Sequence, residues 1–372
     1  MRKTLILAAL AVVVVGAPAL AFHDGGVAHC NGCHTMHNSQ NGVGMNDGLA
    51  VGQGYSSLLL FADATSVCLD CHDGGGSYHI WSADPDAPNV GGANRGGGDF
   101  VFLQETNIND GHGGASNPIL GHAAGHSVVS TMKMTIADPV LGTSPGGGYD
   151  ADDLGCTSCH DPHGTGSFRI LYQDGQAVPG AVYTATIDAD GISLFSSQPE
   201  TNSSHNAYRS GYSEWCATCH GDFHAKWGTG ALIHPSGQTL GTDIAAKYNS
   251  YMGSTDCATF PPSGVDPCGS GDGSDAYLAA VPFEWDDVTN ITSYVGAASD
   301  TSKVACMTCH RAHATSSPDA GRWDFSITGL EEDGHESTSY KIPNPYADTS
   351  QRSLCNKCHT QDEFDEVLDF TP

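Results

Sequence analysis

The stretch CNGCHTMH at residues 30–37 contains the pattern that decides how this chain folds. Two cysteines stand three positions apart, and a histidine follows the second cysteine directly. The C-x-x-C-H pattern occurs six times, with cysteines at Cys30/Cys33, Cys68/Cys71, Cys156/Cys159, Cys216/Cys219, Cys306/Cys309 and Cys355/Cys358. The six histidines are His34, His72, His160, His220, His310 and His359. We number these patterns as motifs 1 to 6; each is of the kind that attaches a c-type haem.

The spacing follows from the attachment chemistry, because two thiols add to two vinyl groups of one haem and the adjacent histidine reaches the iron from the same side. Zinc ribbons and disulfide frameworks also use paired cysteines, but neither needs a histidine after the second one. Histidine makes up 19 of the 372 residues. Chance would place one after all six pairs with a probability on the order of 10⁻⁸. The sequence therefore predicts six covalently bound c-type haems with six proximal histidines.

Thirteen further histidines are available for the sixth iron position, and they outnumber methionine, the competing ligand. A histidine three or four residues beyond a motif cannot reach the opposite face of the same porphyrin, but it can reach a neighbouring haem. This group comprises His37, His163, His224 and His313. Histidines with shielding apolar neighbours are His79, His126 and His234. Seven candidates thus compete for six places, and the sequence leaves open whether His224 or His234 is surplus. The remaining histidines are interpreted as solvated loop residues: His23, His29, His112, His122, His205 and His335.

The composition is poor for a chain of this length, with 39% hydrophobic residues and 47 glycines. We therefore expect the haems to serve as the core and the chain to be mostly coil, a haem-organised multihaem cytochrome c fold. Short helices are expected at the motifs and near 241–252 and 274–281, with a short hairpin within 168–195, where FRILY and GAVYTATI flank polar turns. No domain boundary is visible, so residues 22–372 are expected to form one hexahaem domain.

The N-terminal residues 1–21 have the features of a secretory signal: two basic residues, a short apolar run and the small-residue site Ala19-Leu20-Ala21. We expect export and no membrane span. The 14 basic and 42 acidic residues give a net charge of −28, which excludes a basic nucleic-acid-binding surface. The two remaining cysteines, Cys257 and Cys268, are expected to form a disulfide that closes a small loop, as is usual in an exported chain.

An ordered set of segments resembles the OmcS-type hexahaem cytochromes, extracellular proteins that metal-reducing bacteria polymerise into conductive filaments. The segments are FHDGGVAHCNGCHTMHNS, CLDCHDGGGSYHI, CTSCHDPHG, SEWCATCHGDFHA, IHPSG, YNSY, VPFE, CMTCHRAHA and CNKCH. The resemblance implies six bis-histidine haems stacked in one continuous series. It also implies that His37 binds a haem of the next protomer, the one attached at His310. The cysteines Cys257 and Cys268 have no counterpart in the family pattern, and His29 stands where the pattern has an acidic residue.

These observations favour an electron-transfer protein over an enzyme, because six irons closed by histidine bind no substrate. The predicted function is extracellular electron transfer through a head-to-tail homopolymer, with redox partners in the cell envelope and acceptors outside the cell. One alternative is a monomeric periplasmic electron carrier. A less favoured alternative is a multihaem oxidoreductase with one open haem.

Overall fold

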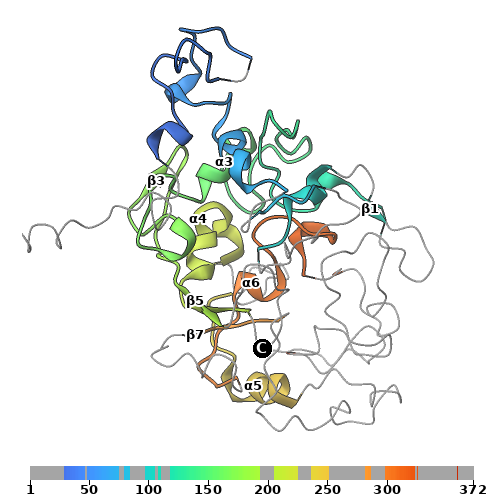
Figure 1. Cartoon of the computed structure of the whole chain (residues 1–372). Coiled ribbons are helices and arrows are strands. Elements are labelled where there is room, and N and C mark those ends of the chain that lie inside the picture. The colour runs from blue at the N-terminus through green and yellow to red at the C-terminus, as the bar shows by residue number, and fades with distance from the viewer. Residues whose placement is uncertain are drawn as a thin grey trace, which may run out of the picture.

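The computed structural model describes residues 29–46, 48–74, 79–83, 97–104, 108–109, 118–192, 205–224, 236–250, 281–285, 298–322, 325 and 358. Within these ranges the helices and strands are short and separated by long stretches of irregular chain (Figure 1). This confirms the prediction of a mostly coil fold. The predicted signal sequence at 1–21 lies outside the described residues.

Most of the helical structure lies at or beside the motifs. The α-helices of the described ranges are α3 (Ala64–His72), α4 (Tyr212–His224), α5 (Gly241–Ser250) and α6 (Cys306–Cys309). Single 3-10 turns occur at Cys30–Gly32, Ser56–Leu58, Phe100–Gln104, Gly121–Ala123, Ala151–Asp153, Cys156–Ser158, Phe168–Ile170 and Pro318–Ala320. The α5 helix confirms the one predicted near 241–252, whereas residues 274–280 of the other predicted helix lie outside the described ranges.

The start of α3 shows how a polar residue fixes a motif helix. The carboxylate of Asp63 caps α3 by accepting hydrogen bonds from the backbone nitrogen and the hydroxyl of Ser66, at 2.7 and 2.8 Å. The same carboxylate accepts from the backbone nitrogen and hydroxyl of Thr131, at 2.9 and 2.6 Å. Asp63 therefore joins the motif 2 helix to a chain segment far away in the sequence.

Within the described ranges, three small sheets accompany the helices. The strands are β1 (Ile108–Asn109), β2 (Pro118–Ile119), β3 (Ala177–Val178), β4 (Ala181–Val182), β5 (Ala189–Ile192), β6 (His205–Arg209) and β7 (Glu284–Trp285). Antiparallel pairs join β1 to β2, β3 to β4 and β5 to β6, whereas β7 pairs with β6 in parallel.

The β3–β4 pair, with Ala177 opposite Val182, is a hairpin within 168–195, and GAVYTATI contributes one of its two strands as predicted. The expectation that FRILY contributes a strand is wrong. Residues Phe168–Ile170 form a 3-10 turn in which Arg169 has a positive φ of 49°. The physical reason is a hydrogen bond from the imidazole of His160 to the carbonyl oxygen of Arg169, which requires that carbonyl to point away from a strand ladder.

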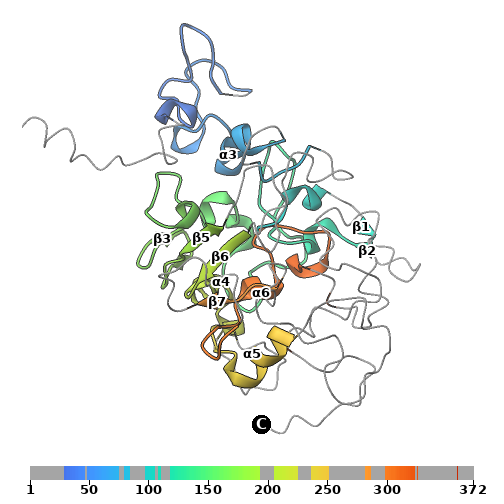
Figure 2. The ribbon, with the colours of Figure 1, turned by 60° about the horizontal axis from the view of Figure 1, so that its bottom comes forward.

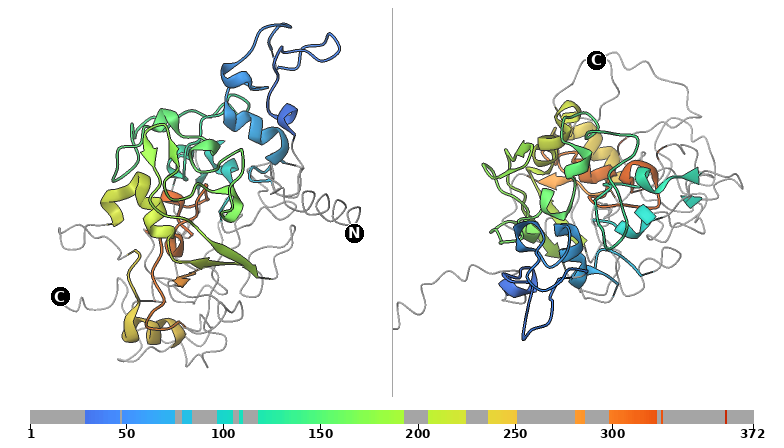
Figure 3. Two further views of the ribbon diagram at one scale, coloured as in Figure 1. Left: turned by 90° about the vertical axis from the view of Figure 1, so that its left-hand side faces the viewer. Right: turned by 90° about the horizontal axis from the view of Figure 1, so that it is seen from above.

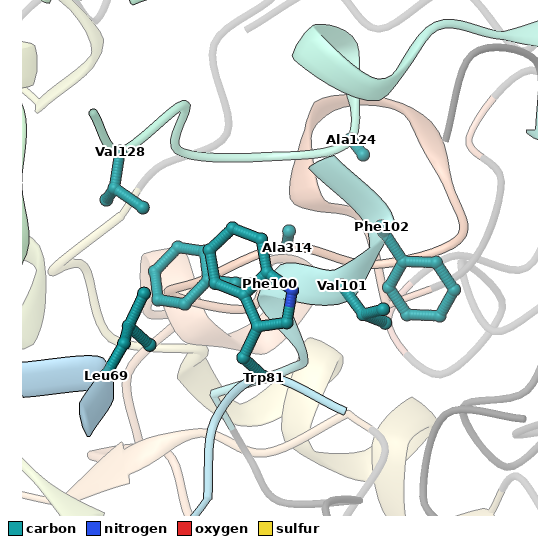
Figure 4. Close-up of a cluster of buried hydrophobic side chains, with 8 residues drawn as sticks. All are labelled: Leu69, Trp81, Phe100, Val101, Phe102, Ala124, Val128 and Ala314. Carbon is teal, nitrogen blue, oxygen red and sulfur yellow. The ribbon is translucent and has the colours of Figure 1, made fainter. Parts of the chain in front are cut away.

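Among the residues that the structure describes, buried apolar side chains gather in three small clusters. One cluster packs Leu69 of α3 against Trp81 and Phe100, together with Val101, Phe102, Ala124, Val128 and Ala314 (Figure 4). A second surrounds Tyr248 of α5 and Phe283. The third is centred on Tyr208 and Tyr212, at the end of β6 and the start of α4. This division fits a composition too poor in apolar residues for a single core of normal size.

The motif-bearing elements follow one another through the molecule. In Figure 1 the segment that contains motif 1 projects beyond α3 at one end, α4 and α6 lie in the middle, and α5 lies at the opposite end. Figure 2 and the left panel of Figure 3 keep this order and show the same projection of the N-terminal described segment. None of the helices in the described ranges has the length and apolar character needed to cross a membrane.

Candidate haem-attachment sites

The five motifs that the structure describes in full each place their cysteines on a helical turn. In motifs 1, 3 and 5 the backbone nitrogen of the histidine donates to the carbonyl of the first cysteine, at 2.9, 3.0 and 3.0 Å. A turn of this kind puts both thiols on one side, with the imidazole beside them. In motif 4 the α4 backbone departs from helical geometry at His220, where φ is −120° and ψ is 40°. In motif 6, Cys358 is described, whereas Cys355 and His359 lie outside the described residues.

Nine cysteines of the described residues are free thiols: Cys30, Cys33, Cys68, Cys71, Cys156, Cys159, Cys216, Cys219 and Cys306. Within the same residues, no group of three or more His, Cys, Asp or Glu side chains is arranged to hold a metal ion. The predicted disulfide between Cys257 and Cys268 lies outside the described ranges and stays a prediction.

Cysteines of successive motifs lie beside one another. The Cys68 thiol of motif 2 is within hydrogen-bond contact of Cys156 of motif 3. Cys216 of motif 4 makes the same contact with Cys306 of motif 5. The contacts bring the attachment points of motifs 2 and 3, and of motifs 4 and 5, directly together.

The cysteines of motifs 1 and 2, and those of motifs 3 and 4, are also close to each other. Burial raises the pKa of the Cys33 thiol in motif 1, and the neighbouring Cys68 and Cys71 thiols raise it further. Burial raises the pKa of Cys159 to about 12, and Cys219 of motif 4 adds to this effect.

Motifs 5 and 6 are linked through the apolar cluster around α5. Cys309 of motif 5 and Cys358 of motif 6 both pack against this cluster. The attachment points therefore follow the order of the motifs in the sequence, from motif 1 to motif 6.

In the described chain, four of the proximal imidazoles donate their Nδ1 hydrogen to a backbone carbonyl. The pairs are His34 with Ser57 at 3.0 Å, His160 with Arg169 at 2.9 Å, His220 with Pro145 at 2.8 Å and His310 with Asp319 at 2.8 Å. A histidine that binds a metal through Nε2 characteristically donates its other ring hydrogen in this way. The bond fixes the tautomer and leaves Nε2 unprotonated, which is the form a haem iron requires.

Two pairs of imidazoles have the separation that bis-histidine coordination requires. The ring centroids of His34 and His163 are 6.4 Å apart, and the two ring planes are 6° from parallel. The centroids of His126 and His220 are 6.0 Å apart, with an interplanar angle of 55°. Two imidazole nitrogens that share one metal ion, each ~2 Å from it, place their ring centres roughly 6 Å apart. The residues present therefore fit a haem iron between each pair.

A third combination involves His313 and His160. Burial and, to a lesser extent, the nearby imidazole of His160 lower the pKa of His313 to about 3. Burial likewise lowers the pKa of His126 to about 4, with His220 adding to the effect, although the bond from its Nδ1 to the carbonyl of Ala312 at 2.7 Å opposes the shift. Both side chains are therefore neutral at physiological pH, as metal-binding histidines are.

The other predicted distal histidines are in different surroundings. His79 is buried, at 4% exposure. His224, at the end of α4, lies so close to Gly237 that a Cβ on that glycine would be 3.0 Å from the imidazole Cε1. His37 is exposed on the projecting N-terminal segment. His234 lies outside the described residues, so the choice between it and His224 stays open.

Aromatic side chains fill the space between motifs 3 and 4. Tyr183 stacks on Tyr172 at 5.3 Å and on Trp215 at 4.7 Å, measured between ring centroids. Trp215 directly precedes Cys216 and donates from Nε1 to the carbonyl of Tyr172 at 2.9 Å. The sequence reasoning did not identify these residues, although the position of Trp215 beside a motif cysteine was a usable signal.

A buried carboxyl group lies between motifs 4 and 5 and was also not anticipated. Glu284 of β7 has no exposed surface. Burial raises its pKa to about 8, and the carboxylate of Glu214 raises it further, whereas Lys303 acts in the opposite direction. Its electrostatic neighbours include Cys216 and Cys306, so the carboxyl lies beside two attachment points.

Comparison with known proteins gives a consistent result. No family model matches the chain. The C-type cytochrome OmcS of Geobacter sulfurreducens is 32% identical over 452 residues, an alignment that covers 97% of this chain and 99% of the relative. The cryo-EM structure of OmcS nanowires from the same organism matches with a TM-score of 0.73 and 30% identity, and covers 91% of this chain and all of that one. A second structure, an outer membrane cytochrome S filament, matches with a TM-score of 0.74 over the same shares.

Proposed function

The chain belongs to the OmcS family of c-type cytochromes, and we propose that it carries electrons outside the cell through six bis-histidine haems in a head-to-tail homopolymer. Bound haem c supplies a one-electron iron couple, and the protein sets its ligands, burial and spacing. The signal sequence, the number of haems and the individual ligands are part of the proposal.

The observation that carries the proposal is a stepwise relation among the three motifs of the form C-x-x-C-H-x-x-H. The second histidine of motif 3, His163, lies opposite His34 of motif 1. The second histidine of motif 5, His313, lies close to His160 of motif 3. Each second histidine thus lies at the proximal histidine two motifs earlier, which places the two ligands of one iron on different motifs.

The same step predicts how copies of the chain connect. His37, the second histidine of motif 1, and His310, the proximal histidine of motif 5, are both exposed. If His37 of one copy binds the haem attached at His310 of the next copy, the second histidine again serves the haem two motifs earlier, now across the contact between two copies. The contact joins two different surfaces, and such heterologous contacts produce open filaments.

The other predicted distal histidines supply the second iron ligands at motifs 2, 4 and 6. His126 faces His220 of motif 4. His72 and His359 are left with His79, His224 and His234 as candidate partners. All six irons are then closed, which favours electron transfer over catalysis. Electrons enter from redox partners in the cell envelope and leave to acceptors outside the cell.

The test is the His37→Ala variant, with His29→Ala as the control that removes another exposed imidazole from the same segment. We expect His37→Ala to retain six haems by pyridine haemochrome analysis, to form no filaments by electron microscopy, and to contain one high-spin haem. Added imidazole should return that haem to low spin without restoring filaments. Normal filaments from His37→Ala would contradict the proposal.

The same preparations separate the alternatives. A wild-type protein that forms no extracellular filaments would indicate a monomeric periplasmic carrier. A high-spin ferric signal in the assembled, oxidised wild-type protein would indicate an open haem and an oxidoreductase.

A further inference from the structure

Motifs 1, 3 and 5 are each held by the same backbone turn, although the sequence around them differs. The turn consists of two consecutive residues with positive φ: Ser57 and Leu58 at 53° and 58°, Arg169 and Ile170 at 49° and 54°, and Asp319 and Ala320 at 57° and 55°. These pairs account for six of the nine non-glycine residues with positive φ in the described chain. Such backbone is uncommon outside glycine and especially unfavourable for a β-branched residue such as Ile170.

Both residues of each turn hold the motif. The carbonyl of the first residue accepts from Nδ1 of the proximal histidine, at 3.0, 2.9 and 2.8 Å in motifs 1, 3 and 5. The carbonyl of the second accepts from the backbone nitrogen that follows this histidine, at 2.8, 2.8 and 2.7 Å. The turn therefore fixes both the imidazole ring and the chain that leaves it.

The chain pairs again two residues after each turn. Leu60 donates to the carbonyl of Cys33 at 2.9 Å, Tyr172 to that of Cys159 at 3.2 Å and Arg322 to that of Cys309 at 2.8 Å. The turn residue is 23 positions beyond the histidine in motif 1 but 9 positions beyond it in motifs 3 and 5. Since loops of different length end in the same geometry, the geometry is not a by-product of loop length.

Motif 4 provides a contrast. Its His220 donates to the carbonyl of Pro145, which lies 75 positions earlier in the chain and is not part of a left-handed pair. The turn thus accompanies the motifs that carry a second histidine. In those motifs the chain after the proximal histidine must leave at once to bring the second histidine to another site, so a separate segment has to hold the ring.

We propose that Ser57, Arg169 and Asp319 are positioning residues that orient the proximal imidazoles of motifs 1, 3 and 5 and increase the basicity of their Nε2 atoms. The inference rests on the proposed function, in which these imidazoles bind haem iron. A donor bond from Nδ1 to a carbonyl makes Nε2 a stronger ligand, which stabilises ferric iron and lowers the reduction potential. The left-handed backbone of the turn directs the carbonyl of its first residue toward Nδ1 of the proximal histidine, and this contact explains why the chain keeps an unfavourable conformation.

The experiment compares Arg169→Pro with Arg169→Gly in the full-length, haem-loaded protein. Proline fixes φ near −65° and cannot adopt the turn, whereas glycine adopts it without strain. Both variants lose the Arg169 guanidinium, which lies 5.0 Å from the ring centroid of Phe168. Within the described chain the nitrogen of Arg169 donates no backbone hydrogen bond, so proline removes none.

We expect both variants to retain six haems. Both variants lose the Arg169 charge, which also acts on the imidazole of His313, so the two variants are compared with each other. Spectroelectrochemical titration should show one haem component of Arg169→Pro at a higher potential than in Arg169→Gly, with a different low-spin EPR signal. Identical titrations and EPR signals in Arg169→Pro and Arg169→Gly would overturn the inference. Fewer than six haems in the wild-type protein would contradict the proposed function instead.

A second variant covers the case in which Arg169→Pro does not accumulate. Ile170→Gly removes the side chain that is least compatible with a φ of 54°. It should raise the thermal midpoint while leaving the potentials and EPR signals unchanged. Changed potentials or EPR signals in Ile170→Gly would overturn the inference, because glycine adopts the turn and keeps both of its carbonyls in place.

Discussion

Replacing Glu284 with glutamine should remove a strong pH dependence from the stability of this protein. The Glu284 carboxyl has no exposed surface and its pKa is raised from 4.5 to about 8. A raised pKa in the folded state means that the folded protein binds a proton more tightly than the unfolded chain. The stabilisation is fully present below pH 4.5 and is lost as the pH rises to about 8. Since one pKa unit corresponds to about 1.4 kcal/mol, the free energy of unfolding should fall by about 5 kcal/mol across this window.

The assay is denaturant unfolding of the wild type and Glu284→Gln at several pH values from 5 to 8, followed by circular dichroism. The glutamine side chain keeps the shape of the carboxyl and has no charge to lose. We therefore expect the variant to be similar to the wild type near pH 5, more stable near pH 8, and flatter in its pH profile. Exposed Asp70 on α3 supplies the control, and Asp70→Asn should keep the wild-type profile. Equal pH slopes for the wild type and Glu284→Gln would refute the reasoning.

Two further changes test how the motifs are held. Asp63→Ala removes the α3 cap and the two hydrogen bonds from Thr131. Thermal or chemical unfolding should show that the free energy of unfolding falls by about 2–4 kcal/mol. A decrease no larger than that caused by Asp70→Ala would contradict this role of Asp63. Gly147→Ala would force a Cβ into the carbonyl of Cys219, whereas a Cβ on Gly148 meets nothing within 4 Å. We expect Gly147→Ala, but not Gly148→Ala, to lower the yield of folded protein and to change the spectrum of the haem proposed at His220, because Pro145 in the same loop accepts a hydrogen bond from that imidazole. Equal behaviour of the two variants would exclude this explanation.

The features that the sequence predicts best are those set by local chemistry. The C-x-x-C-H spacing implies a helical turn because two thiols and an imidazole must reach one haem, and α3, α4 and α6 confirm it. Likewise, residues Gly241–Ser250 of the segment predicted to be helical form α5. Low apolar content correctly indicated a mostly coil chain.

The features that the sequence could not predict depend on contacts between distant segments. FRILY has a strand-like composition, yet a hydrogen bond from His160 holds Arg169 in a left-handed turn. The pairing of His34 with His163 follows from how motifs 1 and 3 pack, which no local pattern encodes. The elevated pKa of Glu284 also results from tertiary burial, since its neighbours in the sequence are unremarkable for a strand.

The central claim is that each second histidine of a C-x-x-C-H-x-x-H motif serves the haem of the motif two steps earlier, and that this step continues between copies. The most direct measurement is a cryo-EM map of the wild-type extracellular filament at a resolution that shows imidazole rings. The account predicts His163 and His34 on opposite faces of one haem, and His37 on the haem attached at His310 of the next copy. A map in which His37 binds no iron, or binds one within its own copy, would contradict the account.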